Sequence, residues 1–188
     1  MNAFHIIGID YGYGNIKTAN CCFPTGVESS DNEPTFKQDL LIYEGRYYQI
    51  GIGHKEYAAE KIMDQDYYVL TLAAIARELA REDIREASVY IAAGLPLSWV
   101  GKQKRAFKNY LLQNKEEEFT YRSREYHLHI VGAEVFPQGF AAIAPNLQEF
   151  NGSYMLCDIG NVPLLPAACG AEADPGDRRH YAGVFECF

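Results

Sequence analysis

Residues 4–17 read Phe4-His5-Ile6-Ile7-Gly8-Ile9-Asp10-Tyr11-Gly12-Tyr13-Gly14-Asn15-Ile16-Lys17, and they carry the strongest structural signal of the chain. The isoleucine-rich run that ends at Asp10 is typical of a strand, and the glycines that follow it are typical of a tight turn. An extended pattern then resumes at Ile16 and continues to Phe23. The stretch therefore predicts a β-hairpin at the start of a sheet.

The same turn has the composition of a phosphate-binding loop. Glycine lets the backbone approach a ligand closely, so Gly12 and Gly14 can aim successive amides at a phosphate. Lys17 can place a cation against the same phosphates, and Asp10 can hold Mg²⁺ through its water ligands. A hairpin that needs glycine only for its turn is the alternative interpretation of this window.

Two common nucleotide motifs do not fit this turn. A Walker A loop needs Gly-Lys-Ser/Thr before a helix, whereas Ile16 precedes Lys17 in an extended stretch. The dinucleotide-binding fingerprint needs a third glycine and a following helix, and the sequence has neither at this point. The hypothesis of a phosphate site therefore requires a second supporting motif.

A second acid-glycine turn lies late in the chain, at Asp158-Ile159-Gly160-Asn161, after an apolar strand predicted over residues 152–158. Two strand ends of this kind would form a clamp, with a carboxylate and backbone amides on each side of a nucleotide's phosphates. Between the two turns, Pro137 suits the first turn of a helix predicted over residues 137–145, which places Gln138 in that same turn.

The rest of the pattern predicts an α/β fold around one mixed sheet. Further strands are predicted over residues 40–43, 47–52, 87–93 and 126–131, the first two being joined by a turn. Residues 24–34 are predicted to be a loop. Apolar residues spaced three and four apart predict amphipathic helices over 69–82 and 98–112. We therefore expect residues 4–161 to form a single sheet that opens with an antiparallel hairpin and is flanked by helices.

The composition limits the class of protein. The chain has 188 residues, of which 48% are hydrophobic, and its net charge of −8 excludes a large basic surface for direct binding of nucleic acid. No apolar run reaches the roughly 18 residues of a membrane helix, and no basic segment precedes an apolar one at the start, so we expect a cytoplasmic protein without membrane contact. The five cysteines include no C-x-x-C pair, so we expect neither a disulfide framework nor a cysteine zinc site.

Three further segments are expected to have no chemical role. His127 and His129 share one strand face without a third ligand at recognisable spacing, which favours surface or packing positions over a metal site. The three glutamates at 116–118 are expected in a solvated loop or helix end. Residues 162–188 are rich in proline and show no sustained period, so they are expected to form an atypical, mobile tail, foreign to a domain over residues 1–161.

The two acid-glycine turns together resemble those of the actin-like ATPases, and within them the plasmid-segregation branch of ParM and StbA type. Residues 10–17 look like that family's first phosphate motif, Asp-x-Gly-x-Gly-x-x-Lys, and residues 158–161 look like the start of the second. The stretches Tyr43-Glu44-Gly45-Arg46-Tyr47-Tyr48 and Ala93-Gly94-Leu95-Pro96 also resemble that branch. The resemblance covers roughly residues 4–161 and implies an actin-like, ribonuclease H-like domain.

The resemblance also implies a chemistry for the site. Asp10 and Asp158 would place Mg²⁺ and its waters, and Gln138 would orient the water that attacks the γ-phosphate. The nucleotide, ATP or GTP, would be bound by Gly12, Tyr13, Gly14, Asn15, Lys17, Gly160 and Asn161. The implied partners are further copies of the chain in a filament and a DNA-bound adaptor protein.

The sequence departs from the family pattern after Asn161. The family continues with Thr or Ser and then with a second half that carries the adenosine-binding segment, whereas Val162-Pro163 follows here. We therefore expect a truncated N-terminal half that binds Mg–ATP weakly and is incompetent alone. The competing interpretations are a fragment of a sugar or acetate kinase of the same superfold and a non-catalytic assembly module.

Overall fold

The computed structural model describes residues 4–12, 14–53, 64–95, 97–139, 144, 148, 154–159 and 181–186. The chain divides into two compact units, residues 1–137 and 138–188. The first unit contains a large sheet with two helices, and the second contains a pair of strands.

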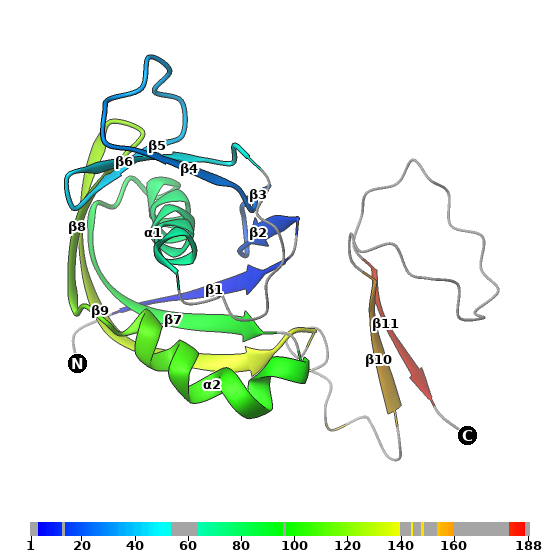
Figure 1. The fold of residues 1–188 in the computed structure, drawn as a ribbon. Coiled ribbons are helices and arrows are strands. Elements are labelled where there is room, and N and C mark those ends of the chain that lie inside the picture. The colour runs from blue at the N-terminus through cyan, green and yellow to red at the C-terminus, as the bar shows by residue number, and fades with distance from the viewer. Residues whose placement is uncertain are drawn as a thin grey trace. The chain divides into compact units, whose positions relative to one another are not determined.

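The first unit is built on a nine-stranded mixed sheet (Figure 1). Its strands are β1 (His5–Tyr11), β2 (Asn15–Lys17), β3 (Cys22–Pro24), β4 (Val27–Ser30), β5 (Leu40–Tyr43), β6 (Arg46–Ile50), β7 (Glu86–Leu95), β8 (Glu116–Tyr121) and β9 (Arg124–Pro137). They lie in the order β3-β2-β1-β7-β9-β8-β5-β6-β4. β7 is parallel to both β1 and β9, and the other neighbouring strands are antiparallel. The predicted mixed sheet with an antiparallel opening is therefore confirmed.

Both predicted hairpins are present. β1 and β2 pair around the glycine turn, and β5 and β6 pair across Glu44-Gly45. Glu44 and Gly45 have φ values of 50° and 75°, as a two-residue turn that matches the twist of the strands requires. The predicted loop over residues 24–34 is wrong in part, because Val27–Ser30 forms β4 and pairs with β6.

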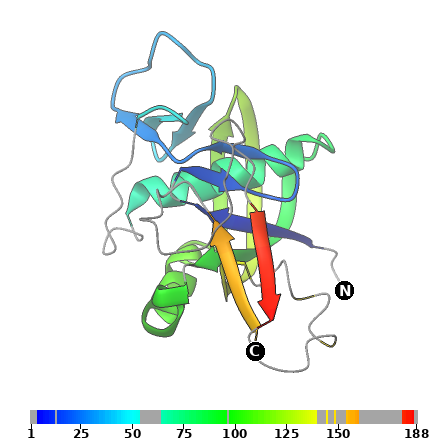
Figure 2. The same cartoon turned by 90° about the vertical axis from the view of Figure 1, so that its right-hand side faces the viewer.

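Helix α1 (Gln65–Ala80) is enclosed by the sheet. Both views place it between β4–β6 on one side and β1 and β7 on the other (Figures 1 and 2). Every residue from Tyr68 to Ala76 is buried. The helix predicted over residues 69–82 is thus confirmed in position, and its buried run is continuous rather than confined to one stripe, because protein surrounds residues 68–76 on all sides.

Helix α2 (Leu97–Leu111) confirms the prediction over residues 98–112. The helix predicted over 137–145 is wrong at its start, because Pro137 is the last residue of β9 and Gln138 and Gly139 form a turn in which Gly139 has φ of 78°. β9 is longer than the sequence predicted because it has two partners, β8 along its first half and β7 along most of its length.

The glutamates at 116–118 begin strand β8, so the predicted solvated loop or helix end is wrong. The alternation of a strand leaves Glu116 and Glu118 exposed and turns Glu117 inward, where its side chain is only 2% exposed. The Glu117 carboxylate accepts a hydrogen bond from the Tyr68 hydroxyl of α1. His127 and His129 lie exposed opposite Glu118 and Glu116, which confirms their surface position.

The second unit contains β10 (Tyr154–Ile159) and β11 (Tyr181–Glu186), which pair antiparallel in a sheet of their own. The expectation that residues 4–161 form a single sheet is therefore wrong for β10. β11 also lies in the segment for which no regular element was predicted. The boundary at Asn161 stays a prediction.

Candidate functional site

The carboxyl ends of the parallel strands β1, β7 and β9 meet at one edge of the first unit's sheet. Asp10 of β1 lies opposite Gly94 of β7, which in turn lies opposite Phe136 of β9. Neighbouring strands are about 4.8 Å apart, so this row of three residues spans about 10 Å. Open α/β sheets bind their ligands outside the carboxyl ends of the strands, which makes this edge the candidate site.

The hairpin brings Asp10 and Lys17 together at this edge. The two residues are direct antiparallel partners in β1 and β2. Directly opposite residues have Cβ atoms about 5 Å apart and point to the same face of the sheet. One oxygen of the Asp10 carboxylate, Oδ1, is shielded from solvent. The side chains of Asp10 and Lys17 therefore start from neighbouring positions beside the glycine turn.

The glycine turn between β1 and β2 is fastened to Thr25. The Thr25 hydroxyl donates a hydrogen bond to the Gly12 carbonyl at 2.9 Å, and the Thr25 backbone N–H donates to the Gly14 carbonyl at 3.0 Å. Thr25 itself is only 5% exposed. Two carbonyls of the turn are thus directed toward Thr25, and a turn held in this way loses little freedom when it binds a ligand.

Close backbone contacts leave no space for side chains in this region. A Cβ atom on Gly12 would lie 2.6 Å from the Asn15 carbonyl oxygen, and a Cβ atom on Gly26 would lie 2.4 Å from the Gly53 carbonyl oxygen. The Gly51 N–H also donates to the Gly26 carbonyl at 2.8 Å. The glycine turn and the loop that fastens it are therefore packed backbone to backbone.

Tyr11 anchors the end of β1 to both helices. Its hydroxyl lies 2.7 Å from the Thr71 hydroxyl of α1, and its ring meets the Phe107 ring of α2 edge-on at 5.3 Å between centroids. Burial raises the pKa of Tyr11 far above its usual value, so the hydroxyl stays protonated. These contacts of Tyr11 with the two helices therefore fix the end of β1 that carries Asp10.

Gln138 is the first residue after β9, at the strand end whose Pro137 pairs with Leu95 of β7. It is half-buried and lies in a turn rather than in the predicted helix, because Gly139 adopts a left-handed conformation. Gln138 therefore directly follows β9 in a turn, whereas the sequence predicted that it lies in a helix.

The other predicted site residues are placed differently. Asn15 begins β2, opposite Pro24 of β3. Asp158 lies in β10 of the second unit, opposite Ala182 and one residue before the strand ends. Tyr13, Gly160 and Asn161 lie outside the described residues. The structure therefore brings together Asp10, Lys17 and the glycine turn, while the second half of the predicted clamp stays a prediction.

Sequence reasoning missed Thr25 and Thr71. They contact Gly12 and Tyr11 from 13 and 60 positions away, and no spacing rule connects such residues. Within the described part of the chain, no group of three or more His, Cys, Asp and Glu residues could hold a metal ion by itself. None of the described helices is long and apolar enough to cross a membrane.

Comparisons with known proteins agree with this geometry. The family model for the N-terminal domain of actin-like proteins matches residues 8–140. A search of curated proteins finds no match. Among solved structures, the chain is similar to Ta0583, an archaeal actin homologue, with a TM-score of 0.63 and 20% identity over 82% of this chain and 53% of that protein. Ta0583 has also been solved in complex with ADP.

Two ParM proteins show the same likeness. ParM in a 15-stranded filament from Clostridium botulinum has a TM-score of 0.60 and 21% identity, over 84% of this chain and 55% of that one. The apo pSK41 ParM protein has a TM-score of 0.60 and 18% identity, over 73% and 50% of the two chains. These likenesses confirm the actin-like fold. The chain spans about half the length of the solved structures that it matches.

Proposed function

The chain belongs to the actin-like proteins through their N-terminal domain, and from this membership and the geometry of the strand-end edge we propose that it is the N-terminal, nucleotide-binding half of a filament-forming protein of the ParM type. Such a protein would act in the cytoplasm in plasmid segregation. It would assemble with further copies of itself when it binds Mg–ATP or Mg–GTP, and it would reach plasmid DNA through an adaptor protein. The likeness to a ParM filament and to an ADP-binding actin homologue supports this proposal.

One observation carries the proposal, namely the convergence of Asp10, Lys17 and the glycine turn fastened by Thr25 at the carboxyl end of β1. Phosphate binding needs fixed backbone donors and positive charge, and the turn and Lys17 provide both. The oxygen donors of Asp10 suit Mg²⁺, which prefers carboxylate, water and phosphate oxygens. The residues present therefore fit a magnesium nucleotide.

In the proposed mechanism the protein mainly positions groups and neutralises charge, because the transition state of phosphoryl transfer is loose. Lys17 and the amides of residues 12–15 would hold the phosphate oxygens, and Asp10 would hold waters of the metal. A bound Mg²⁺ ion would neutralise charge on the phosphates. Gln138 would orient the attacking water, since its amide both donates and accepts hydrogen bonds. Asp158, Gly160 and Asn161 are assigned to the opposite side of the phosphates by the resemblance alone.

The experiment that tests the proposal compares ATP affinity with and without Mg²⁺ in the chain and in two variants. We expect weak but saturable binding, with a dissociation constant of roughly 0.1–1 mM. Lys17→Ala should weaken binding at least tenfold with and without the metal, since a charge-assisted contact contributes about 1.5–3 kcal/mol. Asp10→Ala should instead remove the difference that Mg²⁺ makes. Calorimetry measures both effects.

Lys102→Ala is the matched control, because Lys102 is exposed on α2 and carries the same charge. It should leave both affinities unchanged. Tight binding that is indifferent to Asp10→Ala and Lys17→Ala would contradict the proposal. Light scattering with Mg–ATP, beside a phosphate-release assay, tests assembly and turnover. Turnover that depends on an added sugar or on acetate would favour the kinase interpretation, and assembly without nucleotide would favour the assembly module.

Thr25→Val should weaken ATP binding about fivefold, because it removes the hydroxyl that holds the Gly12 carbonyl, a bond of about 1 kcal/mol. Valine has nearly the same shape as threonine and retains the backbone N–H that bonds to Gly14. Thr25→Ser is the control, since it retains the hydroxyl and should bind ATP as the parent chain does. Equal affinity in the valine variant would show that Thr25 does not preorganise the turn. Titration calorimetry and thermal unfolding separate binding from stability.

A further inference from the structure

A cavity of about 480 Å³ lies at the carboxyl-terminal end of α1, and arginines dominate its wall. The four arginines that line it are Arg77 of α1, Arg81 at the C-cap of α1, Arg122 of the β8–β9 turn and Arg124 of β9. No aspartate or glutamate is found among the described residues of its lining. This concentration of positive charge contrasts with the net charge of −8 of the whole chain.

The cavity is separate from the strand-end edge. Tyr11 meets α1 at Thr71, whereas the cavity is lined by the end of the helix as far as Arg81. Ala76, the first residue of α1 that lines the cavity, lies five residues beyond Thr71, which is about 7.5 Å along the helix. Neither Asp10 nor Lys17 lines the arginine cavity.

Two carboxylates hold the arginines in position without neutralising them. Oδ1 of Asp39 accepts hydrogen bonds from Arg77 at 2.9 Å, Arg122 at 2.6 Å and the Tyr121 hydroxyl at 2.8 Å. Burial alone would raise the pKa of Asp39, but the hydrogen bonds of Tyr121 and Arg122 and the positive charges of Arg77 and Arg122 lower it overall, so the carboxylate stays ionised. Asp39 is thus shared by two guanidinium groups.

Asp83 holds a third arginine of the cavity. Its Oδ1 lies 3.0 Å from Arg124, and 4.0 Å from Arg85, which does not line the cavity. Two aspartates therefore face three of the four arginines of the cavity, and positive charge is left over there. Arg81, exposed at the C-cap of α1, adds a further guanidinium.

The β8–β9 turn maintains a strained backbone at this place. Arg122 and Ser123 have φ values of 51° and 61°, where Asn-Gly is the usual pair in such two-residue turns. A residue with a side chain pays about 1–2 kcal/mol for this left-handed conformation. A two-residue hairpin turn requires these φ values, and the turn places Arg122 so that it donates a hydrogen bond to Asp39 and lies 5.4 Å from the Tyr121 ring.

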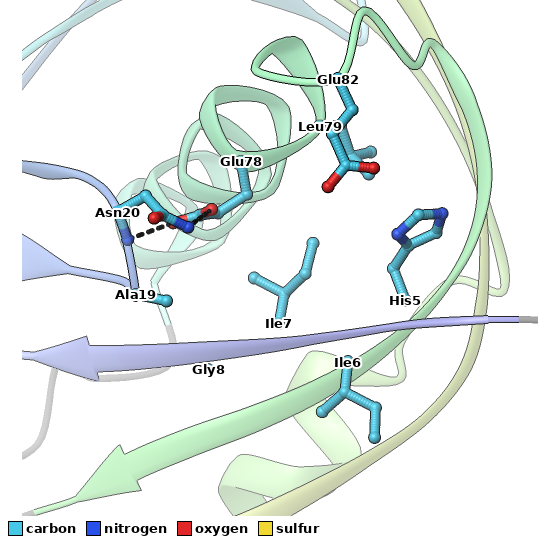
Figure 3. A pocket seen from close by; sticks show the side chains of 9 residues that line it. All are labelled: His5, Ile6, Ile7, Gly8, Ala19, Asn20, Glu78, Leu79 and Glu82. Atoms are coloured by element: carbon cyan, nitrogen blue, oxygen red, sulfur yellow. Dashed lines mark hydrogen bonds between the residues drawn. The ribbon is translucent and has the colours of Figure 1, made fainter.

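A neighbouring cavity of about 210 Å³ is lined by glutamates instead of arginines (Figure 3). It is lined from the same end of α1 by Glu78 and Glu82, and from β1 by His5. The Glu78 carboxylate already accepts two hydrogen bonds from Asn20, each of 2.8 Å. This carboxylate of the smaller cavity is therefore bonded within the chain. The last turns of α1 thus line an acidic cavity with glutamates and a basic cavity with arginines.

We propose that the arginine cavity is a binding site for a small polyanion with at least two neighbouring phosphate or carboxylate groups. The planar guanidinium group matches both anions because it can donate two parallel hydrogen bonds to either. The volume of the cavity lies in the usual range of ligand pockets, about 300–1,000 Å³. Tyr121 and Tyr126 form an apolar part of the cavity wall, since both residues are buried and line the cavity together with the arginines.

The test uses inorganic pyrophosphate and citrate as probes, without Mg²⁺, which both would chelate. Calorimetry on the full chain should show saturable binding of at least one probe, and the stronger probe identifies phosphate or carboxylate as the preferred group. The double variant Arg81→Gln/Arg124→Gln should bind that probe at least tenfold more weakly. Arg77 is left intact because it bonds to Asp39 and Tyr121 and supports the fold.

Lys102→Gln/Arg105→Gln is the matched control, since it removes the same total charge from exposed positions on α2. It should change the affinity less than twofold. Equal weakening in the two double variants would overturn the proposal, as would no saturable binding up to roughly 10 mM. Lys17→Ala separates the cavity from the strand-end site: if it weakens the binding of the probe as much as the arginine variant does, the probe binds at the glycine turn and the cavity is not the site.

Alkylation of Cys21 gives a second, local measurement. Cys21 lines the arginine cavity, whereas the adjacent Cys22 is exposed on β3. The stronger probe should slow the modification of Cys21 several-fold relative to that of Cys22, as followed by peptide mass spectrometry. Protection should disappear in the Arg81→Gln/Arg124→Gln variant. Unchanged Cys21 reactivity at a saturating probe concentration would contradict binding in this cavity.

Discussion

Replacement of Gly12 by alanine is expected to lower the free energy of unfolding by about 1–3 kcal/mol and to weaken ATP binding at least tenfold. The added Cβ atom would lie 2.6 Å from the Asn15 carbonyl oxygen. The contact is with backbone, which cannot rotate away as a flexible side chain can. The turn must therefore shift, and this displaces the amides that the proposed function assigns to phosphate.

Gly8→Ala is the control for this prediction. Gly8 lies on β1, the strand that leads into the turn, and a Cβ atom there would meet nothing within 4 Å. It should leave ATP binding unchanged and alter stability by about 0.4–1 kcal/mol at most, because it mainly restricts the unfolded chain. Urea unfolding and calorimetry of both variants make the comparison. A Gly12→Ala chain with parental stability and affinity would show that the glycine is dispensable and that the turn tolerates rearrangement.

Glu117→Ala is expected to lower the free energy of unfolding by about 2–3 kcal/mol, because it leaves the buried Tyr68 hydroxyl without its acceptor. Burial and the hydrogen bond to Glu117 both raise the pKa of Tyr68, so the hydroxyl stays protonated and donates to Glu117. Tyr43 lies beside the same pair and is held by Asn114 at 3.0 Å. The substitution therefore also leaves a void next to three polar side chains.

Thermal unfolding measures this effect, with an expected fall in the midpoint of roughly 5–10 °C for a chain of this size. Glu118→Ala is the matched control, because Glu118 is the exposed neighbour on the same strand. It should shift the midpoint by about 1 °C or less, as surface substitutions do. Glu117→Gln retains an acceptor for Tyr68 and should fall between the two. Similar midpoints for Glu117→Ala and Glu118→Ala would mean that the buried carboxylate contributes nothing to stability.

The hairpins and the two long helices could be predicted because their signals are local. Glycines after an isoleucine-rich run predicted the β1–β2 turn, and apolar residues three and four apart predicted α1 and α2 to within about four residues. β8 was missed because its three consecutive glutamates conceal the alternation of a strand. That alternation becomes visible only when Glu117 faces Tyr68 of a distant helix.

The positions of the candidate site residues were also predicted only in part. The sequence placed Asp10, the glycine turn and Lys17 within eight residues, and the antiparallel register confirmed Asp10 and Lys17 as neighbours. It placed Gln138 on a helix, where the structure has a turn at the end of β9. The sequence contained no signal for Thr25, since a threonine in a loop has many partners that no pattern distinguishes.

The amino-acid sequence alone was sufficient to establish the α/β class, the opening hairpin and the glycine-rich turn between Asp10 and Lys17, because each depends on residues that are neighbours in the chain. Tertiary structure decided that residues 68–76 of α1 are buried on all sides, that Thr25 fastens the glycine turn, and that Asp10, Gly94 and Phe136 form one row. It also gathered four arginines around one cavity in a chain of net negative charge. These features depend on pairing between segments tens of residues apart, and periods of two or 3.6 residues carry no information about such pairing.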